Sequence, residues 1–337
     1  MMQSQISNIS VYQPKNKLTN AMLRDEFPDL KIKELTRLTG VVSRAVANEN
    51  ETSVDMAVQA AERLFLQEGT DKSLVDFVIF CSAGGDFITP ASACIIQDKL
   101  GLSQQCGAFD FNQGCTGYIY GLSLADSLIK AGNASRVLLL TSETITKTVH
   151  PKDKANRAIF GDAASASLIQ LSGSGSKMGK FIFGTDGSRF DQIIIKHGRE
   201  RFPLPKFAEA DFLDEFGNVR NHASFYMNGS AVFNFSVAKA PELVRALLEQ
   251  SNLKFEDIDL FVFHQANRII LETIGRKLKI PSEKIVIELE NTGNTVSSSI
   301  PVALQKAITS GKCKRGDKIL IAGFGVGFSW GGTVLDY

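Results

Sequence analysis

The sequence predicts an α/β protein whose chain contains the same βα arrangement twice. Apolar strand-like runs alternate with amphipathic helical stretches along most of the 337 residues, which is the pattern of α/β proteins. The order of these elements is the same in the two halves of the chain. The strand-like runs are almost continuously apolar, as in strands that are covered on both faces.

The first half begins with a helical stretch and closes with a strand. Residues 53–69 have the spacing of an amphipathic helix, and the run VDFVIFCSA at 75–83 has the length and composition of a buried strand. The remaining predicted elements are a helix at 91–101, a short strand at 108–111, a helix at 116–132 and a strand at 136–143.

The second half repeats this order. Its predicted elements are a helix at 230–252, a strand at 258–266, a helix at 268–279, a strand at 284–290, a helix at 297–311 and a strand at 318–325. Superposing the two sets pairs Cys81 with His264. It also pairs Cys115 with Asn294, at similar separations in both halves. Because parallel strand ends meet at one edge of an α/β sheet, residues that follow them can converge on one site.

The stretch between the halves departs from the pattern. From about residue 185 to residue 226 it is charged and aromatic and contains two prolines. We expect this insertion to cover a cleft. The predicted organisation is therefore an N-terminal half (1–173), an inserted cap (174–228) and a C-terminal half (229–337), joined without a linker.

Composition excludes several classes of partner and site. The net charge of +1 argues against nucleic acid or a membrane surface as partner, and no apolar run is long enough to span a bilayer. The N-terminal residues do not resemble a secretory signal. The five cysteines lack CxxC spacing, so we expect no disulfide, no metal site and no cofactor, and a cytoplasmic location with reduced thiols.

Three residues past strand ends are candidates for chemistry. Cys115 precedes a helix, whose positive end would lower the pKa of the thiol and make it nucleophilic. The alternative is a small buried hydrophobe. His264 ends an apolar strand and could be a half-buried structural histidine; Asn294 could be a turn residue. The other cysteines are interpreted as core, element-end or loop residues: Cys81, Cys94, Cys106 and Cys313.

The glycine-rich segment GFGVGFSWGG near the C-terminus does not fit a dinucleotide site. Such a site needs a helix after the glycines, and only five residues follow Gly332. Glycines beside a site can instead allow a backbone N–H to point at a developing oxyanion.

Taken in order, the motifs GCTG, HQAN, NTGNT and GFGVGFSWGG resemble the β-ketoacyl-acyl carrier protein synthase III family of the thiolase-like fold. The segments LTGVVSR, TPASACIIQ and AIFGDAASASL match as well, so the resemblance covers nearly the whole chain. It implies two pseudo-symmetric βα halves in a five-layer α-β-α-β-α body and a homodimer. It also implies condensation of an acyl primer with a malonyl group on acyl carrier protein, with loss of carbon dioxide.

The resemblance implies a role for each central residue. Cys115 would be the nucleophile that takes the acyl group. His264 and Asn294 would bind the malonyl thioester carbonyl and stabilise the enolate as neutral donors. The backbone N–H groups of Cys115 and Val326 would form the acyl oxyanion hole.

Substrate-binding positions follow from the same motifs. Phe324 and Phe328 would pack against the site, and Asn267 would contact the substrate. Thr89 stands where many members have a phenylalanine that lines the partner subunit's acyl pocket. A smaller residue there leaves room for a longer or branched acyl chain.

Other positions depart from the family pattern. Glu34 and Lys154 replace the tryptophan and arginine that clamp the adenine of CoA, which favours a carrier-bound or other acyl donor. The basic residues Arg268, Arg276 and Lys277 are expected to dock the acidic carrier protein, although Arg268 is displaced by one position and a solvated helix face explains the other two equally well.

Three hypotheses follow. The first is a ping-pong condensing acyltransferase of fatty acid or specialised acyl and polyketide synthesis. The second keeps an acyl-cysteine but delivers the acyl group to an oxygen or nitrogen nucleophile, or to a β-keto chain, without decarboxylation. The third is a non-catalytic subunit that pairs with an active paralogue; the complete set of Cys115, His264 and Asn294 argues against it.

Overall fold

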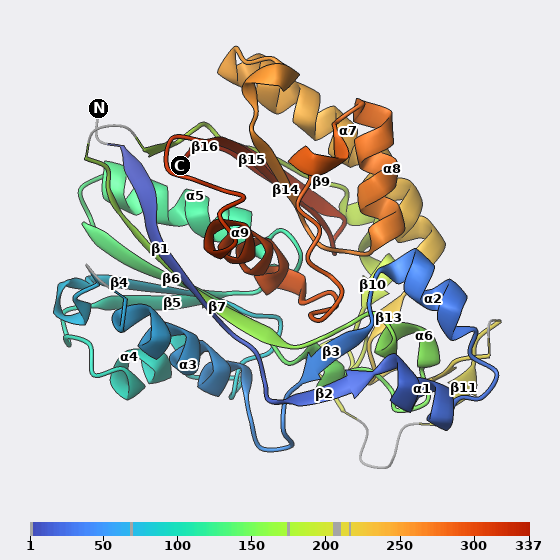
Figure 1. The fold of residues 1–337 in the computed structure, drawn as a ribbon. Coiled ribbons are helices and arrows are strands. Elements are labelled where there is room, and N and C mark those ends of the chain that lie inside the picture. The colour runs from blue at the N-terminus through green and yellow to red at the C-terminus, as the bar shows by residue number, and fades with distance from the viewer. Residues whose placement is uncertain (1–2, 68–69, 174–175, 205–209, 216) are drawn as a thin grey trace.

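Two five-stranded sheets form the centre of the protein (Figure 1). The computed structural model describes residues 3–67, 70–173, 176–204, 210–215 and 217–337. The first sheet has the order β1 (Ser4–Tyr12), β7 (Ala163–Leu171), β6 (Arg136–Glu143), β4 (Phe77–Cys81) and β5 (Gly107–Phe111). The second has the order β14 (Leu260–Phe263), β15 (Lys318–Gly325) and β16 (Ser329–Asp336), and β16 also pairs with β8 (Lys177–Met178) and β9 (Ile182–Thr185).

Helices complete five layers around the sheets, which confirms the predicted α-β-α-β-α body (Figure 1). The outer layer on the first sheet is α3 (Ser53–Phe65) with α4 (Ser92–Lys99), and the layer between the sheets is α5 (Gly117–Lys130) with α9 (Ser299–Thr309). The outer layer on the second sheet is α7 (Gly229–Ser251) with α8 (Arg268–Leu278). Smaller elements are β2 (Asn16–Thr19), β3 (Ser43–Val46), α1 (Asn20–Glu26), α2 (Ile32–Thr39) and α6 (Lys154–Arg157).

The composition of each layer explains its place. Residues 137–140 of β6 are fully buried because helices cover both faces of the sheet. The central helix α5 buries Tyr118, Ile119 and Leu122 between the two sheets. At the first turn of α3, Thr52 and Asp55 form a capping box that satisfies free backbone N–H groups.

The two halves have the same parallel core, as the repeated order predicts. In the first half β4 pairs in parallel with β5 and β6. In the second half β14 pairs in parallel with β15. The carboxyl ends of β5 and β14 lead to the segments that carry Cys115 and His264.

The predicted strand at 284–290 is wrong. The structure has only an isolated bridge between Phe261 and Ile285 at this place. The side chain of Gln265 takes over the pairing: its Nε2 donates to the Val286 carbonyl at 3.1 Å and its Oε1 accepts from the Glu288 N–H at 2.8 Å. Because a side chain satisfies these backbone groups, the segment follows β14 without joining the ladder.

The antiparallel strands β1, β7 and β16 were not predicted from the sequence. In the first sheet β7 pairs with β6, and β1 pairs with β7 at the edge. In the second sheet β16 forms an antiparallel hairpin with β15. Within the predicted cap, β8 and β9 belong to the second sheet. The other described residues of the cap include two small ribbons, β10 (Ile193–Ile194) with β13 (Tyr226–Met227) and β11 (Phe212–Leu213) with β12 (Val219–Arg220). Across the described part of the chain, no helix is both long and apolar enough to cross a membrane.

Candidate active site

One cavity of about 430 Å³ joins the two halves, and it is lined by all three central residues that the sequence indicated: Cys115, His264 and Asn294. Phe324, Val326 and Asn267 line it as well. Much of the remaining wall is apolar and comes from the cap and the helices next to it, including Ile193, Phe225, Met227, Val232 and Ile270. Residues of the cap therefore form part of the cavity wall.

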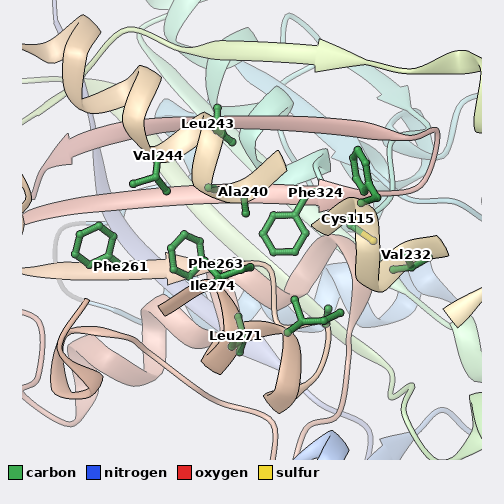
Figure 2. Packing of buried hydrophobic residues seen from close by; sticks show 14 of the residues in the cluster. Cys115, Val232, Ala240, Leu243, Val244, Phe261, Phe263, Leu271, Ile274 and Phe324 are labelled. Carbon is green, nitrogen blue, oxygen red and sulfur yellow. The ribbon is translucent and has the colours of Figure 1, made fainter. Parts of the chain in front are cut away.

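Cys115 lies in the short loop between β5 and α5. Figure 2 shows it beside Phe324 and Val232, at the edge of the apolar cluster under α7 and α8. The β15 backbone passes so close that a Cβ on Gly325 would stand 2.5 Å from the Cys115 sulfur. Only glycine permits this approach, and it brings the N–H of Val326 to the sulfur.

The thiol of Cys115 differs from the prediction in its acidity. Burial raises its pKa to about 11, hydrogen bonds from the Val326 and Cys115 N–H groups oppose this rise, and the Glu143 carboxylate adds to it. This direction is opposite to the expected lowering by the helix: Cys115 is buried, and α5 begins only at Gly117. Those two N–H groups are the pair that the sequence indicated as an oxyanion hole.

A polar network fixes the turn that carries Val326. Gln113 donates to Thr116 Oγ1 at 2.8 Å and to Ser329 Oγ at 3.1 Å, and these two hydroxyl oxygens lie 2.9 Å apart. Ser329 Oγ in turn donates to the Val326 carbonyl at 2.8 Å. The loop of the first half and the β15–β16 turn of the second half are thus held in one arrangement.

His264 is a neutral hydrogen-bond donor to the cavity. It follows β14, is 2% exposed, and meets the ring of Phe324 edge to face at 5.9 Å. Its Nδ1 lies 2.6 Å from Ser299 Oγ, and that oxygen accepts from the Gln265 N–H at 3.3 Å. The Ser299 proton, which has no other acceptor among the described residues, goes to Nδ1, so Nε2 carries the hydrogen. Burial lowers the pKa of His264 to about 3 and keeps the ring uncharged.

Asn294 presents its amide N–H₂ to the same cavity. Its Oδ1 accepts from the Val296 N–H at 2.9 Å, which leaves the two Nδ2 hydrogens for a ligand. Its backbone forms a parallel bridge with Phe160: the Asn294 N–H donates to the Ile159 carbonyl at 2.9 Å and its carbonyl accepts from Gly161 at 3.1 Å. A residue of the second half is therefore positioned by the first.

A buried carboxylate lies beneath the nucleophile. Glu143, the last residue of β6, accepts from Ser297 Oγ at 2.7 Å and from the Ala83 N–H at 3.1 Å. Burial raises the pKa of Glu143 to about 7, hydrogen bonds from Ser297 and Ala83 oppose this, and the charge of Asp162 adds to it. The carboxylate connects the wall residue Ala83 with the segment after Asn294.

The remaining predicted residues do not line this cavity. Phe328 is fully buried behind it and stacks on Phe235 at 4.2 Å between ring centroids. Thr89 lies in an exposed loop of the first half. The others lie on α6 and α8, outside the cavity wall: Lys154, Arg268, Arg276 and Lys277.

Two of these cations have local partners. Lys277 donates to the Val237 carbonyl at 3.0 Å and Arg276 donates to Thr273 Oγ1 at 3.1 Å. Arg268 packs on Gly40, where an added Cβ would stand 2.9 Å from its Nε. Asn267 uses its Oδ1 to cap α8 through the Ile270 N–H, at 2.9 Å.

The sequence did not single out Ser299, Gln113 or Glu143. Ser299 is one of three consecutive serines and Gln113 stands next to a glycine in a loop, so neither carries a signal of its own. Glu143 does carry one, because an acidic residue ends an otherwise apolar strand. Within the described ranges, no three His, Cys, Asp or Glu side chains are grouped so that they could hold a metal ion.

The site can therefore present a thiol, two backbone N–H donors and two neutral side-chain donors to a single carbonyl-bearing ligand. Thioester exchange at sulfur and stabilisation of a developing oxyanion are the reactions that this set favours.

Comparison with known proteins agrees with this arrangement. Residues 109–187 match the family model 3-Oxoacyl-[acyl-carrier-protein (ACP)] synthase III, and residues 248–337 match the model of its C-terminal part. A β-ketoacyl-[acyl-carrier-protein] synthase III of Clostridium perfringens is 34% identical over 335 residues, 99% of each chain. One of Coxiella burnetii is 33% identical over 337 residues, 99% of each chain.

Comparison of the fold with solved structures also indicates similarity to 3-oxoacyl-(acyl-carrier-protein) synthase III. A crystal structure of a 3-oxoacyl-(acyl-carrier-protein) synthase III superposes with a TM-score of 0.97 at 40% identity, and the match covers 99% of this chain and 100% of the other. The sequence matches and the superposition each extend over nearly the entire chain. The chain belongs to the 3-oxoacyl-[acyl-carrier-protein] synthase III family of condensing enzymes.

Proposed function

We propose that the protein is an acyltransferase that joins an acyl primer to a malonyl group on acyl carrier protein and forms a 3-oxoacyl product. The observation that carries this proposal is the single cavity around which Cys115, His264 and Asn294 meet. The family to which the chain belongs supports the reaction class.

In the first step the Cys115 sulfur attacks the primer's thioester carbonyl. A bond forms between this sulfur and the acyl carbon, the primer's own C–S bond breaks, and the Cys115 proton leaves with the departing thiol. The N–H groups of Cys115 and Val326, which hydrogen-bond the sulfur in the free enzyme, stabilise the oxyanion of the tetrahedral intermediate.

In the second step the malonyl thioester takes the place of the departed thiol. Its bond to the carboxylate breaks, carbon dioxide leaves, and the electron pair moves onto the thioester carbonyl. Nε2–H of His264 and Nδ2–H of Asn294 stabilise this enolate. The enolate carbon then attacks the acyl-cysteine, the C–S bond breaks, and the Cys115 sulfur takes up one proton.

Neutral donors suit this second step. A histidine with a pKa of about 3 remains uncharged throughout the physiological range, so it binds the neutral carbonyl weakly and the enolate strongly. The difference between the two is what accelerates decarboxylation.

Intact-mass analysis tests the proposal directly. Incubation with acyl-CoA and acyl-carrier protein should add one acyl group to Cys115, and malonyl-carrier protein should then release carbon dioxide. In the variants His264→Ala and Asn294→Ala the acyl adduct should remain, while decarboxylation falls about 10²–10³-fold. An adduct that is consumed without carbon dioxide release supports acyl transfer to another nucleophile, and no adduct with any donor refutes both.

We also propose that the protein acts as a homodimer, in the cytoplasm, with acyl carrier protein as its partner. β5 is an edge strand of the first sheet, and in the nearby loop Phe87 is 62% and Ile88 86% exposed. An unpaired edge beside exposed apolar residues favours a self-complementary contact. All five cysteines are free, which suits a reducing compartment. Light scattering should give twice the chain mass, and Phe87→Asp should halve it.

A further inference from the structure

The wall of the cavity carries one charged side chain among the described residues, and it is a cation. That residue is Arg199, which lies in the cap. The wall also contains His197, and no Asp, Glu or Lys of the described chain lines the cavity. From the described residues, an anionic ligand entering here would meet one positive charge and no opposing carboxylate.

Arg199 belongs to the solvent-exposed part of the cavity wall, with Ile195 and Gly198 of the same segment. It is exposed, whereas Cys115 is 8% and His264 2% exposed. When the reactive thioester of a substrate reaches the buried Cys115, Arg199 is therefore available to the part of the molecule that remains near solvent.

The loop that carries Arg199 is closed by specific contacts. Gly198 has a φ of +110°, which other residues rarely adopt, and its N–H donates to the Phe202 carbonyl at 2.8 Å. The His197 N–H donates to the His222 carbonyl at 3.0 Å, and the rings of His197 and Phe202 stack at 5.5 Å. The turn at 198–202 is thus attached to the strand-forming part of the cap.

The guanidinium of Arg199 has no polar partner among the residues that the structure describes. Two other arginines are engaged: Arg157 of α6 pairs with Glu26, and Arg220 of the cap pairs with Asp214 at 3.0 Å. Arg199 has no ion pair, side-chain hydrogen bond or ring contact with any described residue. Its sequence neighbour Glu200 is exposed and does not line the cavity.

The geometry points to Arg199 as the binding residue for the phosphate of a phosphopantetheine thioester, the group that CoA and acyl carrier proteins share. This inference rests on the proposed function. A guanidinium binds phosphate through two parallel N–H···O contacts. Glu34 and Lys154 replace the adenine clamp of the family and neither lines the cavity, so among the described wall residues the cationic contact is Arg199 of the cap.

Three acyl donors with the same acyl group test this assignment: acyl-CoA, acyl-phosphopantetheine, and acyl-pantetheine, which lacks the phosphate. Arg199→Gln should lower kcat/KM for Cys115 acylation about tenfold with the first two donors and leave the third unchanged. Arg199→Lys should lose less, because it keeps the charge. Arg201→Gln, on the same turn but outside the cavity wall, is the matched control and should behave as wild type with all three.

Two results would overturn the assignment. One is an equal loss for acyl-pantetheine, which would mean that the variant disturbs the cavity and not a phosphate contact. The other is wild-type rates of Arg199→Gln with both phosphorylated donors. Acyl-carrier protein is a further arm: a loss confined to it, absent with acyl-phosphopantetheine, would place Arg199 on the carrier surface and also contradict the inference.

Failure of the proposed function would look different. In that case the wild-type protein would not be acylated at Cys115 by any donor. If wild type is acylated and only the phosphate dependence of Arg199 is missing, the proposed function stands and this inference alone fails. Raising the salt concentration should reduce the wild-type preference for phosphorylated donors, since a contact between exposed charges is screened.

Discussion

The two halves of the molecule have the same parallel core but use it differently. In the first half, β4 is flanked by β5 and β6, and the loop after β5 carries the nucleophile. In the second half, the equivalent of β5 is not a strand: Gln265 holds residues 285–288 by side-chain hydrogen bonds. Asn294, which follows this segment, is instead paired with residues 159–161 of the first half.

This difference shows how a duplicated scaffold can carry an asymmetric site. The first half keeps its edge strand and supplies a sulfur; the second gives up the strand and supplies two N–H donors. The positions that the repeat pairs, Cys81 with His264 and Cys115 with Asn294, have different chemistry in the two halves. Cys81 is the last residue of β4, and its thiol donates to the Gln113 carbonyl at 3.3 Å. It therefore supports the loop that carries Cys115.

The largest effect is expected when Cys115 is compared with Cys81, two cysteines of the first half. Cys115→Ala should abolish the acyl adduct and lower turnover more than 10³-fold, because the attacking atom is lost. Cys81→Ala should keep the adduct at Cys115 and lose only part of the packing in a fully buried position. Mass mapping of the acylated peptide separates the two; an adduct in Cys115→Ala would assign the nucleophile elsewhere.

In the second half, the Nε2–H donor of His264 depends on Ser299. Ser299→Ala leaves Nδ1 of His264 without its donor, so the ring can adopt the tautomer that has no hydrogen on Nε2. Decarboxylation of malonyl thioester should fall about 10- to 100-fold, while acylation of Cys115 is unchanged. Carbon dioxide release measures the first and intact mass the second.

Ser299→Thr, which keeps a hydroxyl, should restore most of the decarboxylation rate. Equal loss of both half-reactions in Ser299→Ala would show that the serine supports the fold and not the tautomer.

The smallest predicted effect concerns stability and the buried Glu143. Its pKa is raised from 4.5 to about 7 in the folded state, so the folded protein binds the proton more tightly than the unfolded chain. Its contribution to the free energy of unfolding is therefore complete below pH 4.5 and is lost as the pH rises through 7, by about 3 kcal/mol. Glu143→Gln, which keeps an acceptor for Ser297, should flatten this part of the pH profile in urea unfolding. An unchanged slope between pH 5 and 8 would contradict the assignment.

Sequence reasoning predicted the parallel strands and their helices closely, because each is a long apolar or amphipathic run. β15 was predicted with its observed bounds, Lys318–Gly325. Sequence reasoning failed where tertiary contacts determine the secondary structure. Residues 284–290 have the composition of a strand, but the side chain of Gln265 holds them outside the ladder. The strand β16 was missed because Gly331 and Gly332 give SWGGTVLD the composition of a loop.

The site was predictable in its residues but not in its electrostatics. The repeat and the motifs indicated Cys115, His264 and Asn294, and the structure brings these three together. The acidity of Cys115 was predicted in the wrong direction because its burial depends on the cap and on the approach of Gly325, and neither can be read from the local sequence. Arg199 gave no signal, since a charged insertion contains several equivalent cations.

The pairing of Asn294 with Ile159 and Gly161 has a consequence for chimeric proteins. Suppose that the C-terminal half of a relative replaced that of this chain. The relative's asparagine would then have to pair with residues 159–161 of this chain instead of the matching segment of its own protein. A productive crossover would need to carry both segments from one parent, so recombination breakpoints that separate them should yield soluble but inactive hybrids.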